Sequence, residues 1–94
     1  MPYFVVTIEY IQDMSVVEEH TPAHRAFSAG LKERGLLLMS GPFNPRTGGM
    51  LLLKAESVND AVAAFEDDPF KKLDIAKYDI REWIPKVGIE LFEQ

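Results

Sequence analysis

The pattern of hydrophobic and polar positions predicts four strands in this chain. Residues 3–11 carry aromatic and β-branched side chains at alternating positions, which is typical of a strand. Apolar runs at residues 36–40 and 50–55 predict two further strands, and residues 78–84 predict a fourth. Because the segment 44–49 between the second and third strands is rich in Asn, Pro and Gly, we expect a hairpin there, with its two strands paired antiparallel.

Helical spacing of apolar residues predicts a first helix over residues 22–34. Thr21 is a suitable N-cap, Pro22 suits the first helical position, and a glycine stands just past the end. In this register His24 lies in the first turn, on the apolar side of the helix. Because Pro22 would interrupt a longer helix, we expect the polar residues 12–20 to form a loop with at most one helical turn.

A second helix is predicted to begin after Ser57, whose side chain can cap it. Its buried side is expected to consist of Val58, Ala61, Val62 and Phe65. The segment 67–70, Asp-Asp-Pro-Phe, ends this helix and can begin a further short turn. Alternating apolar residues at 87–91 indicate a short extra strand, or an arm laid against a neighbouring molecule.

The order strand, helix, strand, strand, helix, strand predicts an α+β, ferredoxin-like split βαβ domain spanning residues 1–94. Two helices would cover one face of a four-stranded antiparallel sheet. The first strand carries apolar side chains on both of its faces, so the open face of the sheet should also be buried. We therefore expect a homodimer formed through that open face.

Composition and charge narrow the classes of partner. The net charge is −5, from 15 acidic and 10 basic residues, and no block of Lys or Arg longer than two residues occurs. Nucleic acids and anionic membrane surfaces are therefore poor partners. The absence of cysteine excludes thiol nucleophiles, and no apolar run approaches the roughly 20 residues that a membrane helix requires. We expect a cytoplasmic protein.

His24 is the residue best suited to proton transfer near neutral pH. In the first turn of a helix, the helix dipole would favour the neutral ring, which suits a general base. The same inward position is equally consistent with a histidine that only packs in the core. His20 and His24 have the spacing of a metal pair, but Pro22 separates them and no third ligand stands out, so we expect no metal. No phosphate-loop or dinucleotide motif is present, and no cofactor is expected.

Three short motifs follow one another at characteristic places in this pattern. They are Pro22-Ala23-His24 on the first helix, Gly35-Leu36-Leu37 leading to Ser40-Gly41-Pro42, and Asp68-Pro69-Phe70 after the second helix. In this order and spacing the chain resembles the YCII-related (YciI-like) proteins over nearly its whole length. The resemblance implies a dimeric α+β barrel of ferredoxin-like subunits, with a cleft that holds a catalytic histidine and aspartate. These match His24 and Asp68.

At least one branch of this family is similar to enzymes that eliminate halide from chlorinated hydroquinones. The resemblance and the inward histidine together predict a small lyase or isomerase that acts on a polar cyclic or phenolic metabolite. His24 would move the proton, and Asp68 would fix the tautomer of its ring. Ser40 and the backbone around Gly41 and Pro42 would donate hydrogen bonds to a substrate oxygen.

Each of these residues also has a simpler interpretation. Asp68 precedes a proline, so a role as helix N-cap accounts for it fully, and Asp67 could replace it as the partner of the ring. The segment from Ser40 to Pro42 is also typical of the end of a strand. A non-catalytic dimeric module that binds a small molecule in the same cleft is the alternative function. A haem- or oxygen-linked monooxygenase on this barrel has no distinguishing residues here.

Overall fold

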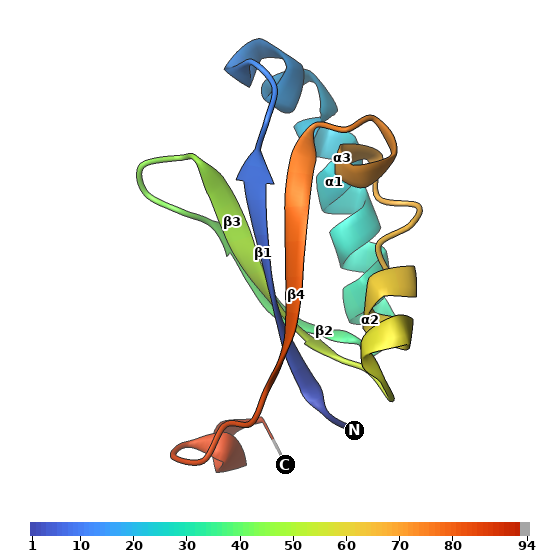
Figure 1. Cartoon of the computed structure of the whole chain (residues 1–94), viewed down its shortest axis with the longest axis vertical. Coiled ribbons are helices and arrows are strands. Elements are labelled where there is room, and N and C mark those ends of the chain that lie inside the picture. The colour runs from blue at the N-terminus through green and yellow to red at the C-terminus, as the bar shows by residue number, and fades with distance from the viewer. Residues whose placement is uncertain (93–94) are drawn as a thin grey trace.

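Four antiparallel strands form one sheet, and α1, α2 and α3 lie together on one side of it (Figure 1). The computed structural model describes residues 1–92. The elements are β1 (Tyr3–Tyr10), α1 (Met14–Glu33), β2 (Leu37–Pro42), β3 (Gly48–Lys54), α2 (Val58–Ala63), α3 (Pro69–Lys72), β4 (Ala76–Trp83) and the 3-10 helix η1 (Ile89–Leu91). The strand order β2-β3-β1-β4 confirms the α+β, ferredoxin-like fold that the order of elements predicts.

The hydrophobic core lies between the sheet and the helices. Phe4, Val6 and Ile8 alternate along β1 and are buried against the helices, as the period of two predicts. From α1, Val17 and Leu31 enter the same core. β1 is one of the two interior strands and pairs with both β3 and β4.

The first helix differs from its prediction. It begins at Met14 and continues through Pro22, so the loop expected over residues 12–20 and the N-cap role of Thr21 are both wrong. Pro22 has no N–H for the carbonyl of Glu18, four residues before it, and the neighbouring Thr21 hydroxyl donates to a different carbonyl, that of Val17, at 2.7 Å. Val17 is fully buried in the core. Packing of the early turns against the sheet therefore outweighs the cost of an internal proline.

The ends of the other helices follow their local signals. Gly35 has a φ of 76°, as expected of a left-handed residue after a helix. The Ser57 side chain accepts from the backbone N–H of Asp60 and caps α2.

The predicted buried side of α2 is only half right. Ala61 and Phe65 are fully buried, whereas Val58 and Val62 are 49% and 40% exposed, because this short helix covers the core with a single edge.

The hairpin between β2 and β3 forms where the sequence predicts it, and the two strands pair antiparallel. Its second strand begins at Gly48, in register with Glu9 of β1. A Cβ at position 48 would overlap the carbonyl of Ile8. Close approach of β1 and β3 therefore requires glycine here.

The segment 87–91 does not form the predicted strand. Gly88 adopts a φ of 87° and turns the chain into η1. The Phe92 ring lies 6.2 Å from the ring of Tyr3 at the start of β1. The predicted strand is therefore replaced by a turn. Contact of this segment with a neighbouring molecule stays a prediction.

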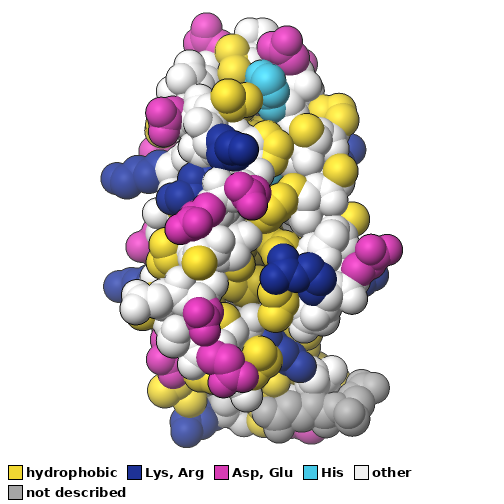
Figure 2. All heavy atoms as spheres, turned by 90° about the vertical axis from the view of Figure 1, so that its right-hand side faces the viewer, with side chains coloured by type: hydrophobic (Ala, Val, Ile, Leu, Met, Phe, Trp, Pro, Cys, Tyr) yellow, Lys and Arg dark blue, Asp and Glu magenta, His cyan; other side chains and the backbone are white. Residues whose placement is uncertain are grey.

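The face that carries the helices shows Lys and Arg interspersed with Asp and Glu (Figure 2). Large blocks of a single sign are not visible on it. Within residues 1–92, none of the helices is both long enough and apolar enough to cross a lipid bilayer.

Candidate active site

His24 and Asp68 meet in the structure, although 44 positions separate them in the chain. The His24 Nδ1 atom lies 2.9 Å from Oδ1 and 3.0 Å from Oδ2 of Asp68. His24 sits near the middle of α1, and Asp68 is the residue that precedes α3. Contrary to expectation, the helix dipole therefore does not act on His24, because its effect is confined to the terminal turns. The partner of the ring is a buried carboxylate instead.

Asp68 is held by hydrogen-bond donors on every side. Its Oδ1 accepts from the backbone N–H of Phe70 at 3.1 Å, which makes it the N-cap of α3 as predicted. Its Oδ2 accepts from the Tyr78 hydroxyl at 2.5 Å. The side chain is fully buried, yet each oxygen has partners. With the Phe70 N–H and the Tyr78 hydroxyl already donating to it, an ionised Asp68 can only accept, and a His24 ring with its proton on Nδ1 would complete this hydrogen bond.

Tyr78 on β4 is the member of this cluster that the sequence analysis missed. Burial raises the pKa of its hydroxyl well above the usual range, and the hydrogen bond to Asp68 raises it further. The hydroxyl therefore stays protonated and donates. A tyrosine at a core-facing position of a strand needs a polar partner, but strand periodicity does not identify which one.

The His24 ring is also fixed from its flat side. It stacks on Phe70, with ring centroids 4.1 Å apart and an angle of 4° between the planes. Tyr10 meets the same Phe70 edge-on, with centroids 5.9 Å apart. The hydrogen bond to Asp68 and this stack together set the orientation of the imidazole. Its second nitrogen, Nε2, has no hydrogen-bond partner among residues 1–92.

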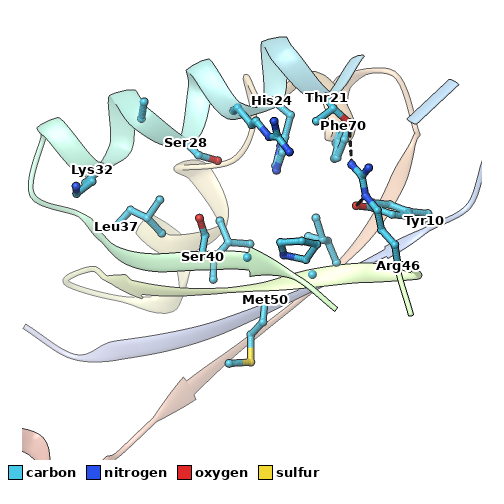
Figure 3. A pocket seen from close by; sticks show the side chains of 17 residues that line it. Tyr10, Thr21, His24, Ser28, Lys32, Leu37, Ser40, Arg46, Met50 and Phe70 are labelled. Atoms are coloured by element: carbon cyan, nitrogen blue, oxygen red, sulfur yellow. Dashed lines mark hydrogen bonds between the residues drawn. The ribbon is translucent and has the colours of Figure 1, made fainter. Parts of the chain in front are cut away.

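A cavity of about 300 Å³ opens beside this ring, between α1 and the strands β2 and β3 (Figure 3). His24 lies on its wall, and the side chain of His24 is 15% exposed. Asp68 is not part of the wall, because it lies behind the histidine. The cavity therefore offers a ligand the imidazole but not its carboxylate partner.

The sequence of the chain matches the YCII-related domain family over residues 1–84. The chain belongs to the YCII-related family. This confirms the resemblance inferred from the three motifs. The family assignment covers β1 to β4 and therefore all the residues of this site described above.

The similar proteins include one curated relative and one solved structure. The YCII-related domain is 32% identical over 66 residues to the uncharacterized protein YjpA of Bacillus subtilis (strain 168), covering 70% of this chain and 78% of that protein. It is also similar to the 5-chloro-2-hydroxyhydroquinone dehydrochlorinase TftG of Burkholderia phenoliruptrix AC1100, solved in complex with 2,5-dihydroxybenzoquinone. That superposition has a TM-score of 0.77 and 22% identity, and it covers 89% of this chain and 95% of TftG. A similarity at this identity shows the common fold.

The other residues singled out from the YCII-related sequence lie as follows. Ser40, Gly41 and Pro42, at the end of β2, all line the cavity opposite α1. Asp67 is exposed, and it is Asp68 that bonds His24. The question left open between these two aspartates is therefore answered by geometry.

Basic side chains around the cavity were not expected from the pattern. Arg25, Ser28 and Lys32, which the helical register puts opposite the apolar side, line the cavity of the YCII-related domain. Arg46 joins them from the β2–β3 hairpin (Figure 3). A hairpin arginine carries no local signal of where its side chain will reach. Only the pairing of β2 with β3 brings it beside α1.

His20 and His24 have separate partners in the structure. His20 lies 3.8 Å from the carboxylate of Glu19, near the start of α1, and is partly exposed. Within the described residues there is no cluster of three or more His, Asp or Glu side chains that could hold a metal ion.

Proposed function

We propose that this protein is a small lyase or isomerase that acts on a polar cyclic or phenolic compound, with His24 as the base and Asp68 as its positioning residue. One observation carries the proposal. The Nδ1 atom of His24 is committed to a buried carboxylate, while the ring itself lies on the wall of a cavity. A histidine so arranged can take a proton at Nε2 while the carboxylate stabilises the imidazolium.

The proposed step is a proton transfer that the residues of this chain can perform. Nε2 of His24 takes a proton from a hydroxyl or a carbon of the bound ring, and the electron pair of the broken bond moves into the ring. In a lyase reaction, a leaving group then departs with its own bonding pair. In an isomerase reaction, the imidazolium returns the proton to a different atom of the ring. Both versions balance without a further reactant.

Ser40, Gly41 and Pro42 are proposed to contribute to substrate binding. They lie along the cavity across from α1, where the Ser40 hydroxyl can donate to a substrate oxygen. The size of the cavity, about 300 Å³, suits a molecule of one ring. The fold similarity to TftG, which is described as acting on a hydroquinone, supports the same class of ligand.

The first test measures the tautomer of His24 by ¹⁵N NMR, at a pH where the ring is neutral. We expect the Nδ1–H form in the wild type. In Asp68→Asn we expect a large population of the Nε2–H form, because the NH₂ group of asparagine can donate to Nδ1. Asp67→Asn is the matched control and should leave the spectrum unchanged. A ring that keeps its tautomer in Asp68→Asn would remove Asp68 from its proposed role.

The second test measures turnover. Chloride release from 5-chloro-2-hydroxyhydroquinone is the first assay, and loss or rearrangement of substituents on other hydroxylated rings, followed by NMR, extends it. His24→Gln keeps the size and polarity of the side chain and should reduce turnover by about 100-fold or more. Full turnover in His24→Gln would refute the proposal.

The alternative is a non-catalytic module that binds a small molecule in the same cavity. Asp68 also caps α3, which gives the buried carboxylate a structural reason to exist. In this case the wild type would bind a hydroxylated ring and return it unchanged. His24→Gln would then alter affinity alone.

We also propose that two copies assemble through the open face of the sheet. Register places Met39, Met50 and Trp83 on that face, and they are 57%, 45% and 46% exposed. A second copy would remove these large apolar side chains from water. Sedimentation at micromolar concentration should show a dimer that Trp83→Arg dissociates, whereas Val58→Arg, on α2, should not. A wild-type monomer would contradict this assembly.

A further inference from the structure

We infer, building on the proposed function of the same cavity, that its ligand is a one-ring organic acid whose anionic group is bound by Arg46. The charge around the cavity supports this. Arg25, Lys32 and Arg46 line it, and none of the lining residues is an aspartate or glutamate. Acidic residues outnumber basic ones in the whole chain, 15 to 10, whereas the charged residues that line the cavity are all basic.

None of these three cations is paired with an acidic side chain within residues 1–92. The ion pairs within residues 1–92 join His20 to Glu19, His24 to Asp68 and Arg81 to Asp79. None of them involves Arg25, Lys32 or Arg46. Three unneutralised positive charges around one concave surface raise the local concentration of anions and favour an anionic ligand over a neutral one.

Arg46 is the cation that is preorganised by hydrogen bonds to its neighbours. Its Nε donates to the Tyr10 hydroxyl at 3.3 Å, and one terminal nitrogen donates to Thr21 Oγ1 at 3.1 Å. The guanidinium carbon also lies 5.8 Å from the centroid of the Tyr10 ring. The Thr21 hydroxyl can accept this bond because its own proton is donated to the carbonyl of Val17. The guanidinium N–H groups that remain can bind a carboxylate with little further loss of side-chain entropy.

The spacing on α1 between Thr21, which binds Arg46, and His24 fits a ligand of one ring. Thr21, which holds the guanidinium, and His24 are three residues apart on α1, so their Cβ atoms lie roughly 5–6 Å apart on neighbouring rows of the helix. An acid group at Arg46 would therefore place an attached ring beside His24 and its stacking partner Phe70. The Ser40 end of the cavity would receive the far substituent of that ring.

The experiment compares acids with amides of the same shape. The probes are benzoate with benzamide, and 2,5-dihydroxybenzoate with 2,5-dihydroxybenzamide, titrated against ¹⁵N-labelled protein while the backbone signals of Ser28 and Ser40 are followed. We expect the acid to bind about 10-fold more tightly than its amide, the size of one exposed charge-assisted interaction. The preference should weaken as salt is raised.

Two variants carry the same change of charge. Arg46→Gln should lower the affinity for the acid about 10-fold and remove its advantage over the amide. Arg34 lies outside the cavity, and Arg34→Gln should change the affinity for the acid by less than about 2-fold. The inference is wrong if acid and amide bind equally, if Arg34→Gln matches Arg46→Gln, or if neither acid shifts the cavity signals at about 10 mM.

The outcome is independent of the catalytic proposal. His24→Gln should lose turnover and keep the preference for acids. Arg46→Gln should keep the Nδ1–H tautomer of His24 and lose the preference. A failed tautomer test would therefore leave the anion site standing, and a failed acid test would leave the proton-transfer pair standing.

Discussion

The Nδ1 atom of His24 lies within 3.0 Å of both carboxylate oxygens of Asp68, and the same carboxylate caps α3. One buried group thus serves the fold and the candidate site together. It holds the start of α3, anchors the Tyr78 hydroxyl of β4 and orients the imidazole of α1. Changes at Asp68 should therefore affect stability as well as chemistry, whereas changes on the cavity side of His24 should affect chemistry alone.

Replacement of Asp68 by Asn should lower the free energy of unfolding by about 2–3 kcal/mol. The amide still offers one oxygen to the Phe70 N–H or the Tyr78 hydroxyl, but its NH₂ group faces a donor. Urea denaturation followed by circular dichroism measures the change. The neighbouring Asp67→Asn is the control, and because Asp67 is exposed it should stay within about 0.5 kcal/mol of the wild type. Equal effects at the two positions would contradict the structure.

Stability at high pH should depend on Tyr78. Burial raises the pKa of the folded hydroxyl, so the folded state keeps a proton that the unfolded chain releases near pH 10. The resulting stabilisation is fully present below about pH 10. Above this pH the free energy of unfolding falls by up to about 1.4 kcal/mol per pH unit. Denaturation between about pH 9 and pH 11.5 should show this extra loss in the wild type and not in Tyr78→Phe. Parallel pH profiles would contradict it.

The continuous helix through Pro22 makes an unusual prediction for Pro22→Ala. If α1 began at this residue, as the local sequence suggests, the substitution would be neutral or destabilising. Within a helix that begins at Met14, alanine restores the missing N–H, and we expect a gain of about 1–2 kcal/mol in the free energy of unfolding. The gain is less than the intrinsic difference of about 3 kcal/mol, because proline also restricts the unfolded chain. Thermal and urea denaturation both report the sign.

Two glycine substitutions should have opposite signs. At Gly48, a Cβ would overlap the Ile8 carbonyl, and Gly48→Ala should cost about 3 kcal/mol or unfold the protein. At Gly30, inside α1, a Cβ meets no atom within 4 Å. Gly30→Ala should therefore add about 0.5–1 kcal/mol. No loss of stability in Gly48→Ala would contradict the register of β1 against β3. A loss of stability in Gly30→Ala would contradict the open surroundings of α1 at that position.

Much of the fold is predictable from the chain because its signals are local. Alternation along β1, the turn residues of the hairpin and the caps at Ser57 and Asp68 each depend on neighbours a few positions away. The local signal failed at Pro22, where a proline that favours a helix start lies inside a helix. Burial of Val17 against the sheet decides that case, and burial depends on residues distant in sequence.

The sequence by itself determined the order of strands and helices, the family, and a short set of candidate residues that included His24 and Asp68. Only the tertiary structure decided that Asp68 rather than Asp67 meets the ring, that Tyr78 completes the cluster, and that Arg46 reaches the cavity. The physical reason is that hydrogen bonds between side chains require the atoms to meet within about 3 Å. For residues tens of positions apart, that separation is set by the packing of α1, α3 and the sheet, which periodicity and capping do not encode.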